Sequence, residues 1–117
     1  MKDWKDQIDL SNIELQYPFV GKYDRKKTPV YRGVMQYFPD AIKEIAKTSY
    51  AATQQHHPDK KMFWDRNKSN DHYDAMIRHL IDHEENPIDD DQQLHLAKVA
   101  WRALAGLQVY LESIKSK

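Results

Sequence analysis

The sequence predicts a small all-α domain: a helical bundle of three main helices with an extended N-terminal arm, completed by oligomerisation. Apolar residues recur at the three- and four-residue spacing of a buried helix face, and proline, asparagine and serine separate the periodic segments. A chain of 117 residues is long enough for one hydrophobic core and too short for two. One helical domain is therefore expected.

The N-terminal segment, residues 1–31, is predicted to be an arm that precedes the single helical domain at 32–117. It mixes charges, aromatic residues and two prolines without a sustained helical or strand period. Its apolar side chains would let it wrap around a neighbouring molecule. A mobile tail is an equally good interpretation of the same segment.

Boundary signals divide the domain into helices. Pro39 suits the first turn of a helix, where its missing N–H costs nothing. Ser69 is the expected N-cap of the next helix, with acidic Asp71 close behind it. The run from Asp89 to Asp91 is expected to open the third, because negative charge is favoured at a helix N-terminus. The predicted helices span residues 39–56, 70–85 and 90–115.

The third predicted helix is the most informative, because it is apolar around most of its circumference. Residues 94–109 contain four polar side chains, and at 100° per residue three of these four fall on one narrow stripe. Such a stripe must face solvent, a partner carboxylate or a polar cleft. The stripe consists of Asp91, His95, Lys98 and Arg102.

The second predicted helix carries a complementary set. Asp71, Asp74 and Arg78 recur at i, i+3 and i+7, and His79 follows. Asp74 and Arg78 are also well placed for an ordinary surface ion pair. Because short connections make these two helices antiparallel neighbours, we expect Asp74, Arg78 and His79 to lie opposite the polar stripe. Carboxylates, imidazoles and cations in one cleft suit a phosphate-bearing ligand, with Mg²⁺ held by the carboxylates.

The connection between the first two helices adds further candidates: His56, His57, Trp64, Arg66 and Lys68. An aromatic ring beside cations can stack a nucleobase, and Trp64 fits equally well as a core residue. The two adjacent histidines do not have a recognised zinc spacing.

Composition excludes several classes of function. Lys plus Arg and Asp plus Glu number 18 each, so no overall field would attract a nucleic acid or an acidic membrane. There are no cysteines, which fits a reducing cytoplasm. No apolar run reaches the length of a membrane span. We expect a cytoplasmic protein with no nucleic-acid or membrane partner.

Three stretches carry a family likeness: YFPDAIKEIAKTSYAATQQHHPD, FWDRNKSNDHYDAMIRHLIDH and DDDQQLHLAKVAWRALAGLQ. Over residues 29–112 the chain resembles the dATP/dGTP diphosphohydrolase N-terminal family of phages and bacteria, and it is most similar to a basic subgroup with AKVAWRAL. The resemblance implies a phage protein in the bacterial cytoplasm that binds a purine deoxynucleoside triphosphate and cleaves its phosphate chain.

Under this hypothesis the protein is a metal-dependent nucleoside triphosphate diphosphohydrolase. Asp71 and Asp74 would hold Mg²⁺, and the catalytic groups would be Asp74, His79 and His95. The ligand-binding residues would be Trp64, Arg66, Lys68, Arg78, Lys98 and Arg102.

Two other interpretations fit the same residues. A non-catalytic protein that sequesters a nucleotide or nucleotide signal, opposing host defence, needs the same cations without metal carboxylates. A structural protein could instead use the polar stripe to hold an oligomer together. Apolar residues spread around the third helix predict a homo-oligomer under any of these interpretations.

Overall fold

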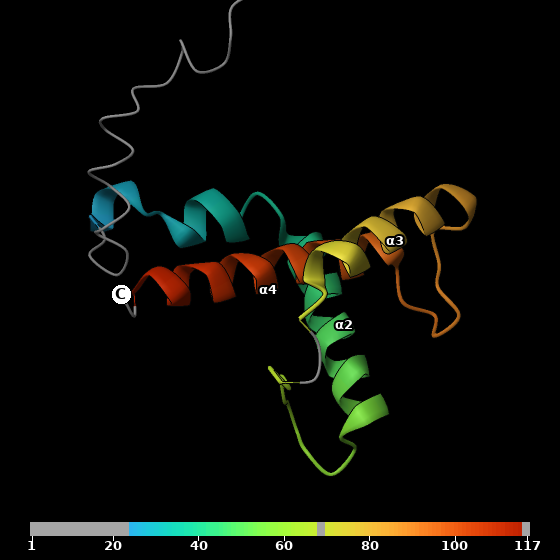
Figure 1. Ribbon diagram of the computed structural model, residues 1–117. Coiled ribbons are helices and arrows are strands. Elements are labelled where there is room, and N and C mark those ends of the chain that lie inside the picture. Colours follow the sequence, from blue (N-terminus) through green and yellow to red (C-terminus); the bar gives the residue numbers. More distant parts are fainter. Residues whose placement is uncertain (1–23, 68–69, 116–117) are drawn as a thin grey trace, which may run out of the picture.

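The computed structural model of the protein describes residues 24–67 and 70–115, and this part of the chain is built from helices (Figure 1). The fold class predicted from the sequence is confirmed. In the described residues, β-type pairing is limited to one isolated bridge between Ile88 and Leu94. The elements are a 3₁₀-helix η3 (Arg25–Lys27), a short π-helix η4 (Tyr31–Met35), and the α-helices α2 (Pro39–His56), α3 (His72–Glu85) and α4 (His95–Lys115).

Helices α3 and α4 form an antiparallel pair and make the main packing contact of the structure (Figure 1). A small residue lies on the face of α3 that meets α4, since Ala75, between His72 and His79, is fully buried. Farther along, a Cβ atom added to Gly106 would lie 3.0 Å from Cε1 of Tyr73. Gly106 therefore makes room for the Tyr73 ring at the start of α3.

Helix α2 crosses this pair and packs against α4 (Figure 1). The indole Nε1 of Trp101 on α4 donates a hydrogen bond to Oγ of Ser49 on α2. One turn later, Thr53 Oγ1 donates to the Ser49 carbonyl at 3.1 Å and accepts from the Phe63 N–H at 3.2 Å. This buried hydroxyl ties the connection after α2 back onto the helix, which places Phe63 and its neighbours beside α4.

The predicted bounds agree with the structure for α2 and differ at the start of the next two helices. α3 begins at His72 with Asp71 as its N-cap residue, two positions later than predicted. Ser69, the expected N-cap, lies outside the described residues.

The prediction that Asp89 to Asp91 open the third helix was wrong. These residues form a tight loop, and α4 begins only at His95. Asp89 Oδ1 accepts from the Asp90 N–H and Asp91 Oδ1 from the Gln93 N–H, so the carboxylates satisfy local backbone donors outside a helix. Gln92 adopts a left-handed φ of 68°, which also interrupts helical geometry.

The predicted arm is described only in its last residues, because residues 1–23 lie outside the described part. There the chain forms η3, with Asp24 accepting from the Lys26 N–H as an N-cap, and η4 begins at Tyr31. Neither of these short helices was predicted from the sequence. Among the described helices, none is long and apolar enough to cross a membrane.

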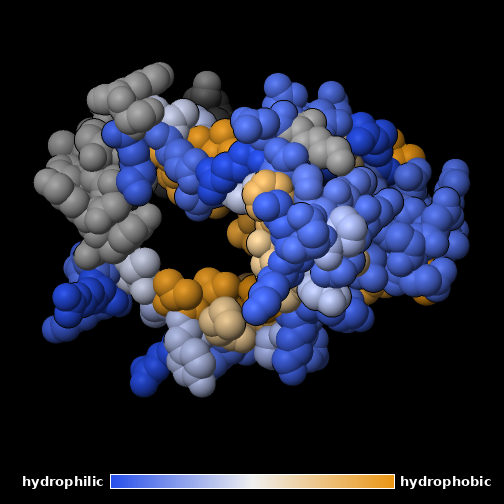
Figure 2. Space-filling model, turned by 90° about the horizontal axis from the view of Figure 1, so that it is seen from below, coloured by the Kyte–Doolittle hydropathy of each residue, from blue (hydrophilic) through white to orange (hydrophobic). Residues whose placement is uncertain are grey.

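Within the described residues, the buried hydrophobic side chains are all small: Ala75, Ala97 and Ala105. Large apolar side chains remain at the surface, among them Leu107 with 55% and Ile81 with 60% of their area exposed. Figure 2 shows apolar side chains exposed on one face of the molecule. Among the described residues, most of the large apolar side chains are therefore exposed.

Candidate functional site

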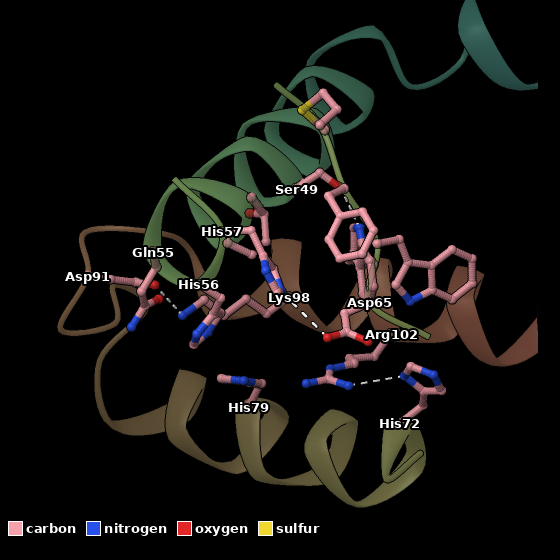
Figure 3. Close-up of a pocket in the computed structure, with 16 residues that line it drawn as sticks. Ser49, Gln55, His56, His57, Asp65, His72, His79, Asp91, Lys98 and Arg102 are labelled. Carbon is pink, nitrogen blue, oxygen red and sulfur yellow. Dashed lines mark hydrogen bonds and ion pairs between the residues drawn. The ribbon is translucent and has the colours of Figure 1, made fainter. Parts of the chain in front are cut away.

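A pocket of about 600 Å³ lies where α2, α3, α4 and the connection after α2 meet (Figure 3). Its volume is in the range of small-molecule sites in proteins. Helix α4 contributes the floor through Lys98, Trp101 and Arg102, and α3 contributes His72 and His79. The remaining lining residues come from α2, the connection and the loop before α4: Thr48, Ser49, Ala52, Gln55, His56, His57, Met62, Phe63, Trp64, Asp65 and Asp91.

Aromatic rings form one wall of this pocket. Trp64 and Trp101 meet edge to face, with ring centroids 5.6 Å apart. The guanidinium of Arg66 lies 4.0 Å from the Trp64 ring and is held by an ion pair with Glu112 on α4. Trp64 therefore packs against Trp101 and lines the pocket, and its stacking on a nucleobase stays a prediction.

Arg102 brings positive charge to the same pocket. Its guanidinium approaches Nδ1 of His72 at 3.1 Å and Oδ1 of Asp71 at 3.8 Å, and Figure 3 shows it directed into the pocket. Burial, and then the charge of Arg102, lower the pKa of His72 against the opposing effect of Asp71. His72 is thus neutral at pH 7, and its ring nitrogen orients the guanidinium as an acceptor.

Lys98 lies one turn before Arg102 and has different surroundings. Its Nζ donates to Oδ2 of Asp89 at 2.6 Å and to Oδ2 of Asp91 at 2.7 Å. The hydrogen bond from Lys98 is the main cause of the lowered pKa of Asp89. Burial alone would lower the pKa of Lys98, but the hydrogen bonds with both carboxylates outweigh it and raise the pKa. These hydrogen bonds hold the loop before α4 in place. Lys98 could bind a phosphate only if it lost its hydrogen bond to one of the two carboxylates.

Two histidines meet at the other end of the polar stripe. Nδ1 of His79 on α3 and Nδ1 of His95 on α4 lie 3.0 Å apart, and His95 is only 5% exposed. Burial is the largest cause of the lowered pKa of His79, followed by the charge of Lys98, while Asp89 opposes the shift. His79 is therefore a neutral imidazole at pH 7, and it also lines the pocket.

The expected convergence of the two helices is found for some of the predicted residues. Trp64, His79, Lys98 and Arg102 line the pocket, and His95 lies directly behind His79. The narrow stripe on α4 does face a polar pocket. This agreement follows from the antiparallel packing of α3 and α4, which the short connection predicted.

Other predicted residues lie elsewhere. Asp74 and Arg78 are exposed on α3 and do not line the pocket, and Arg78 pairs with Asp71 at 3.5 Å. Arg66 lies behind Trp64 and outside the pocket lining. Lys68 is outside the described residues. Of the cationic residues predicted to bind phosphate, only Lys98 and Arg102 line the pocket among the described residues.

The expected metal ligands Asp71 and Asp74 do not gather a third ligand around them. In the part of the chain that the structure describes, one group of three close metal-ligand side chains is found, namely His79, Asp82 and His95. Asp71 instead lies beside the guanidinium groups of Arg78 and Arg102. The best donor set for a metal is therefore the histidine cluster.

Sequence reasoning missed His72 and Asp65 as pocket residues. His72 is seven positions before His79, and this spacing places both on one helix face, so a search for repeated histidines would have found it. Asp65 comes into the pocket through the connection after α2, where its carboxylate lies 3.5 Å from Nε2 of His57. No periodicity in the sequence marks this contact.

Comparison with known proteins adds no relative. No protein-family model, no curated protein and no solved structure matches the chain.

The Asp89–Lys98 ion pair predicts a defined pH dependence of stability. We expect Asp89→Asn to lower the free energy of unfolding at pH 7 by about 1 kcal/mol, since the pair is only partly exposed. The folded-state pKa of Asp89 is lowered, so its contribution is complete above the ordinary pKa of about 3.9 and disappears as pH falls through the folded value. The difference between wild type and variant, measured by urea unfolding, should therefore shrink between about pH 5 and pH 3.

Asp90→Asn is the matched control, because Asp90 is an exposed aspartate in the same loop and no ion pair of the described residues includes it. It should unfold like wild type. Equal stability of wild type and Asp89→Asn at pH 7, or a difference that grows on acidification, would contradict this account of the loop.

Proposed function

We propose that the pocket binds a purine deoxynucleoside triphosphate and that the protein is a dATP/dGTP diphosphohydrolase-like phosphohydrolase. One observation supports the proposal most strongly: an aromatic wall and the guanidinium of Arg102 line the same pocket of about 600 Å³. Aromatic rings suit a nucleobase, and a guanidinium suits phosphate oxygens through parallel N–H donors. The resemblance to the diphosphohydrolase family supplies the same substrate class.

The polar lining is suited to reading a base and holding phosphates. Ser49 and Gln55 provide hydroxyl and amide groups on the α2 side. His79 of α3 and Arg102 of α4 face them across the pocket (Figure 3). A base against Trp101 would place its phosphates toward Arg102. His79, a neutral imidazole, adjoins that end of the pocket.

The charge of the pocket favours a nucleotide that arrives with a divalent cation. Lys98 and Arg102 are balanced within the lining by Asp65 and Asp91. A triphosphate alone would therefore meet carboxylates as well as cations. Mg²⁺ bound to the phosphates would neutralise part of their charge, and carboxylate oxygens are the ligands that it prefers. We therefore keep Mg²⁺, bound with the nucleotide, as part of the proposal.

Sequestration without cleavage is the second candidate function. It is favoured by the position of Asp74, which was expected to act in catalysis and lies exposed outside the pocket. A binding protein needs only the aromatic wall and Arg102. The two functions differ in whether the nucleotide is recovered intact.

The test is incubation with dATP, dGTP, ATP, GTP and cyclic dinucleotides, with and without Mg²⁺, followed by chromatography of the products. Cleavage of the purine deoxynucleoside triphosphates supports the enzyme, and depletion with intact recovery after denaturation supports sequestration. Arg102→Ala should weaken binding by about 1.5–3 kcal/mol, because it removes a charged hydrogen-bond donor from the pocket. Arg102→Lys should give an intermediate loss, since it retains charge without the planar fork.

Arg78→Ala is the control for charge removal, because Arg78 is exposed and lies outside the pocket. It should bind nucleotide as tightly as wild type. If folded Arg102→Ala and wild type bind every nucleotide equally, or if wild type binds none, the nucleotide pocket is wrong.

We also propose that a second copy of the chain covers the exposed apolar side chains, which makes the protein a homo-oligomer in solution. Ile77, Leu104 and Tyr110 are each at least half exposed, so one chain leaves large apolar groups in water. Light scattering at micromolar concentration should give at least twice the 13.9 kDa mass of one chain. A mass of 13.9 kDa under those conditions would contradict the oligomer.

A further inference from the structure

Three metal-ligand side chains converge where α4 begins beside α3. His79 and Asp82 are three positions apart on α3, which places them on one face of the helix. His95 is the first residue of α4 and faces them from the antiparallel neighbour. One ligand atom from each residue lies within 4.8 Å of the other two. This histidine cluster, His79, Asp82 and His95, is distinct from the predicted Asp71 and Asp74 pair.

The distance between the two imidazoles is close to that of shared coordination. Their Nδ1 atoms lie 3.0 Å apart. Two nitrogens bound at about 2.1 Å to one tetrahedral ion would be separated by about 3.4 Å, so the rings would need to part by about 0.4 Å. A direct hydrogen bond between the rings is the other use of this distance, and it requires one Nδ1 to carry a proton and the other to lack it. A hydrogen bond between the two rings would not involve the nearby Asp82 carboxylate. A metal site would use it as the third ligand.

The surroundings hold the cluster in place. His95 is buried, and its backbone N–H donates to the Pro87 carbonyl at 3.0 Å, which fixes the start of α4. The His79 side chain is also largely buried, with 20% of its area exposed. Both imidazoles are therefore held by packing before any ion arrives.

Two carboxylates lie near the imidazoles. Asp82 belongs to the cluster, and Oδ2 of Asp89 lies 4.0 Å from Nδ1 of His79 and 3.8 Å from Nδ1 of His95. Lys98 pairs with Asp89 at 2.6 Å and offsets its charge. The Asp82 carboxylate therefore supplies the negative charge that a cation at the cluster would meet directly.

We propose that His79, Asp82 and His95 bind a divalent transition metal ion of the zinc, cobalt or manganese type. Two imidazole nitrogens and one carboxylate are a donor set that such ions accept, whereas Mg²⁺ prefers oxygen ligands throughout. The assignment makes His79 and His95 metal ligands in place of the proton-transfer groups expected from the sequence. It does not depend on the nucleotide, because all three ligands come from the chain itself.

The site adjoins the pocket through His79, which belongs to both. If the pocket holds a nucleotide as proposed, the ion lies on the side of the pocket that His79 lines, where phosphate groups beyond those held by Arg102 would reach it. A bound transition metal would supply positive charge to phosphate oxygens there. This last step rests on the proposed function, and the ion site does not.

Metal binding by the tag-free, chelator-treated protein, in the absence of nucleotide, tests the proposal. Titration with Zn²⁺ by calorimetry and with Co²⁺ by visible absorption should give about one ion per chain, and excess Mg²⁺ should not displace it. His79→Gln and Asp82→Asn should each weaken Zn²⁺ binding at least about tenfold, because each removes a ligand. Asp82 is exposed, so its replacement leaves the fold intact even if the more buried His79 is needed for folding.

His83→Gln and Asp74→Asn are the matched controls, since both residues lie on α3 and outside the cluster. They should bind Zn²⁺ within about twofold of wild type. The proposal is overturned if wild type binds no Zn²⁺ or Co²⁺, if Mg²⁺ competes on equal terms, or if Asp82→Asn binds Zn²⁺ as wild type does. Since no nucleotide is present, these outcomes leave the nucleotide pocket to be judged by its own test.

Discussion

The close antiparallel packing of α3 against α4 is the constraint on which the rest of the structure depends. Fully buried Ala75 and the space at Gly106 let these helices approach without large side chains between them at these points. Polar contacts then form across the seam, from Arg102 to His72 at one end and from His79 to His95 at the other. The Arg102–His72 contact and the His79–His95 contact both depend on the packing of this helix pair.

Neighbouring cations on one helix face have different uses because their surroundings differ. Lys98 donates to two carboxylates of the loop before α4, and it thereby fixes the point where the helix begins. Arg102, one turn later, lies beside neutral His72 and the Asp71 carboxylate and faces the pocket. Lys98 gives hydrogen bonds to two carboxylates, whereas the guanidinium of Arg102 lies 3.8 Å from the carboxylate of Asp71, so the two cations are held to different degrees.

The sequence was sufficient for the fold class, the bounds of α2 and the orientation of the polar stripe, because these follow from helical periodicity and from Pro39. The first residue of α4 could not be predicted from helical periodicity. The preference of acidic residues for a helix N-terminus was outweighed by the hydrogen bonds that the Asp89 and Asp91 carboxylates accept from local backbone N–H groups and from Lys98. The partners of Lys98 could not be predicted either, since they lie in a loop whose shape the periodicity does not encode.

The central claim is that the pocket between α2, α3 and α4 is the functional site, and the two tryptophans that line it allow a direct measurement. In an amide NMR spectrum of the ¹⁵N-labelled protein titrated with dGTP, we expect the indole signals of Trp64 and Trp101 to shift together with the backbone signals of Arg102 and His79. The backbone signals of Glu84 and Glu85, exposed residues of α3 outside the pocket lining, serve as the internal reference and should not shift. Shifts confined to residues outside the pocket, or an unchanged spectrum at saturating dGTP, would contradict the account.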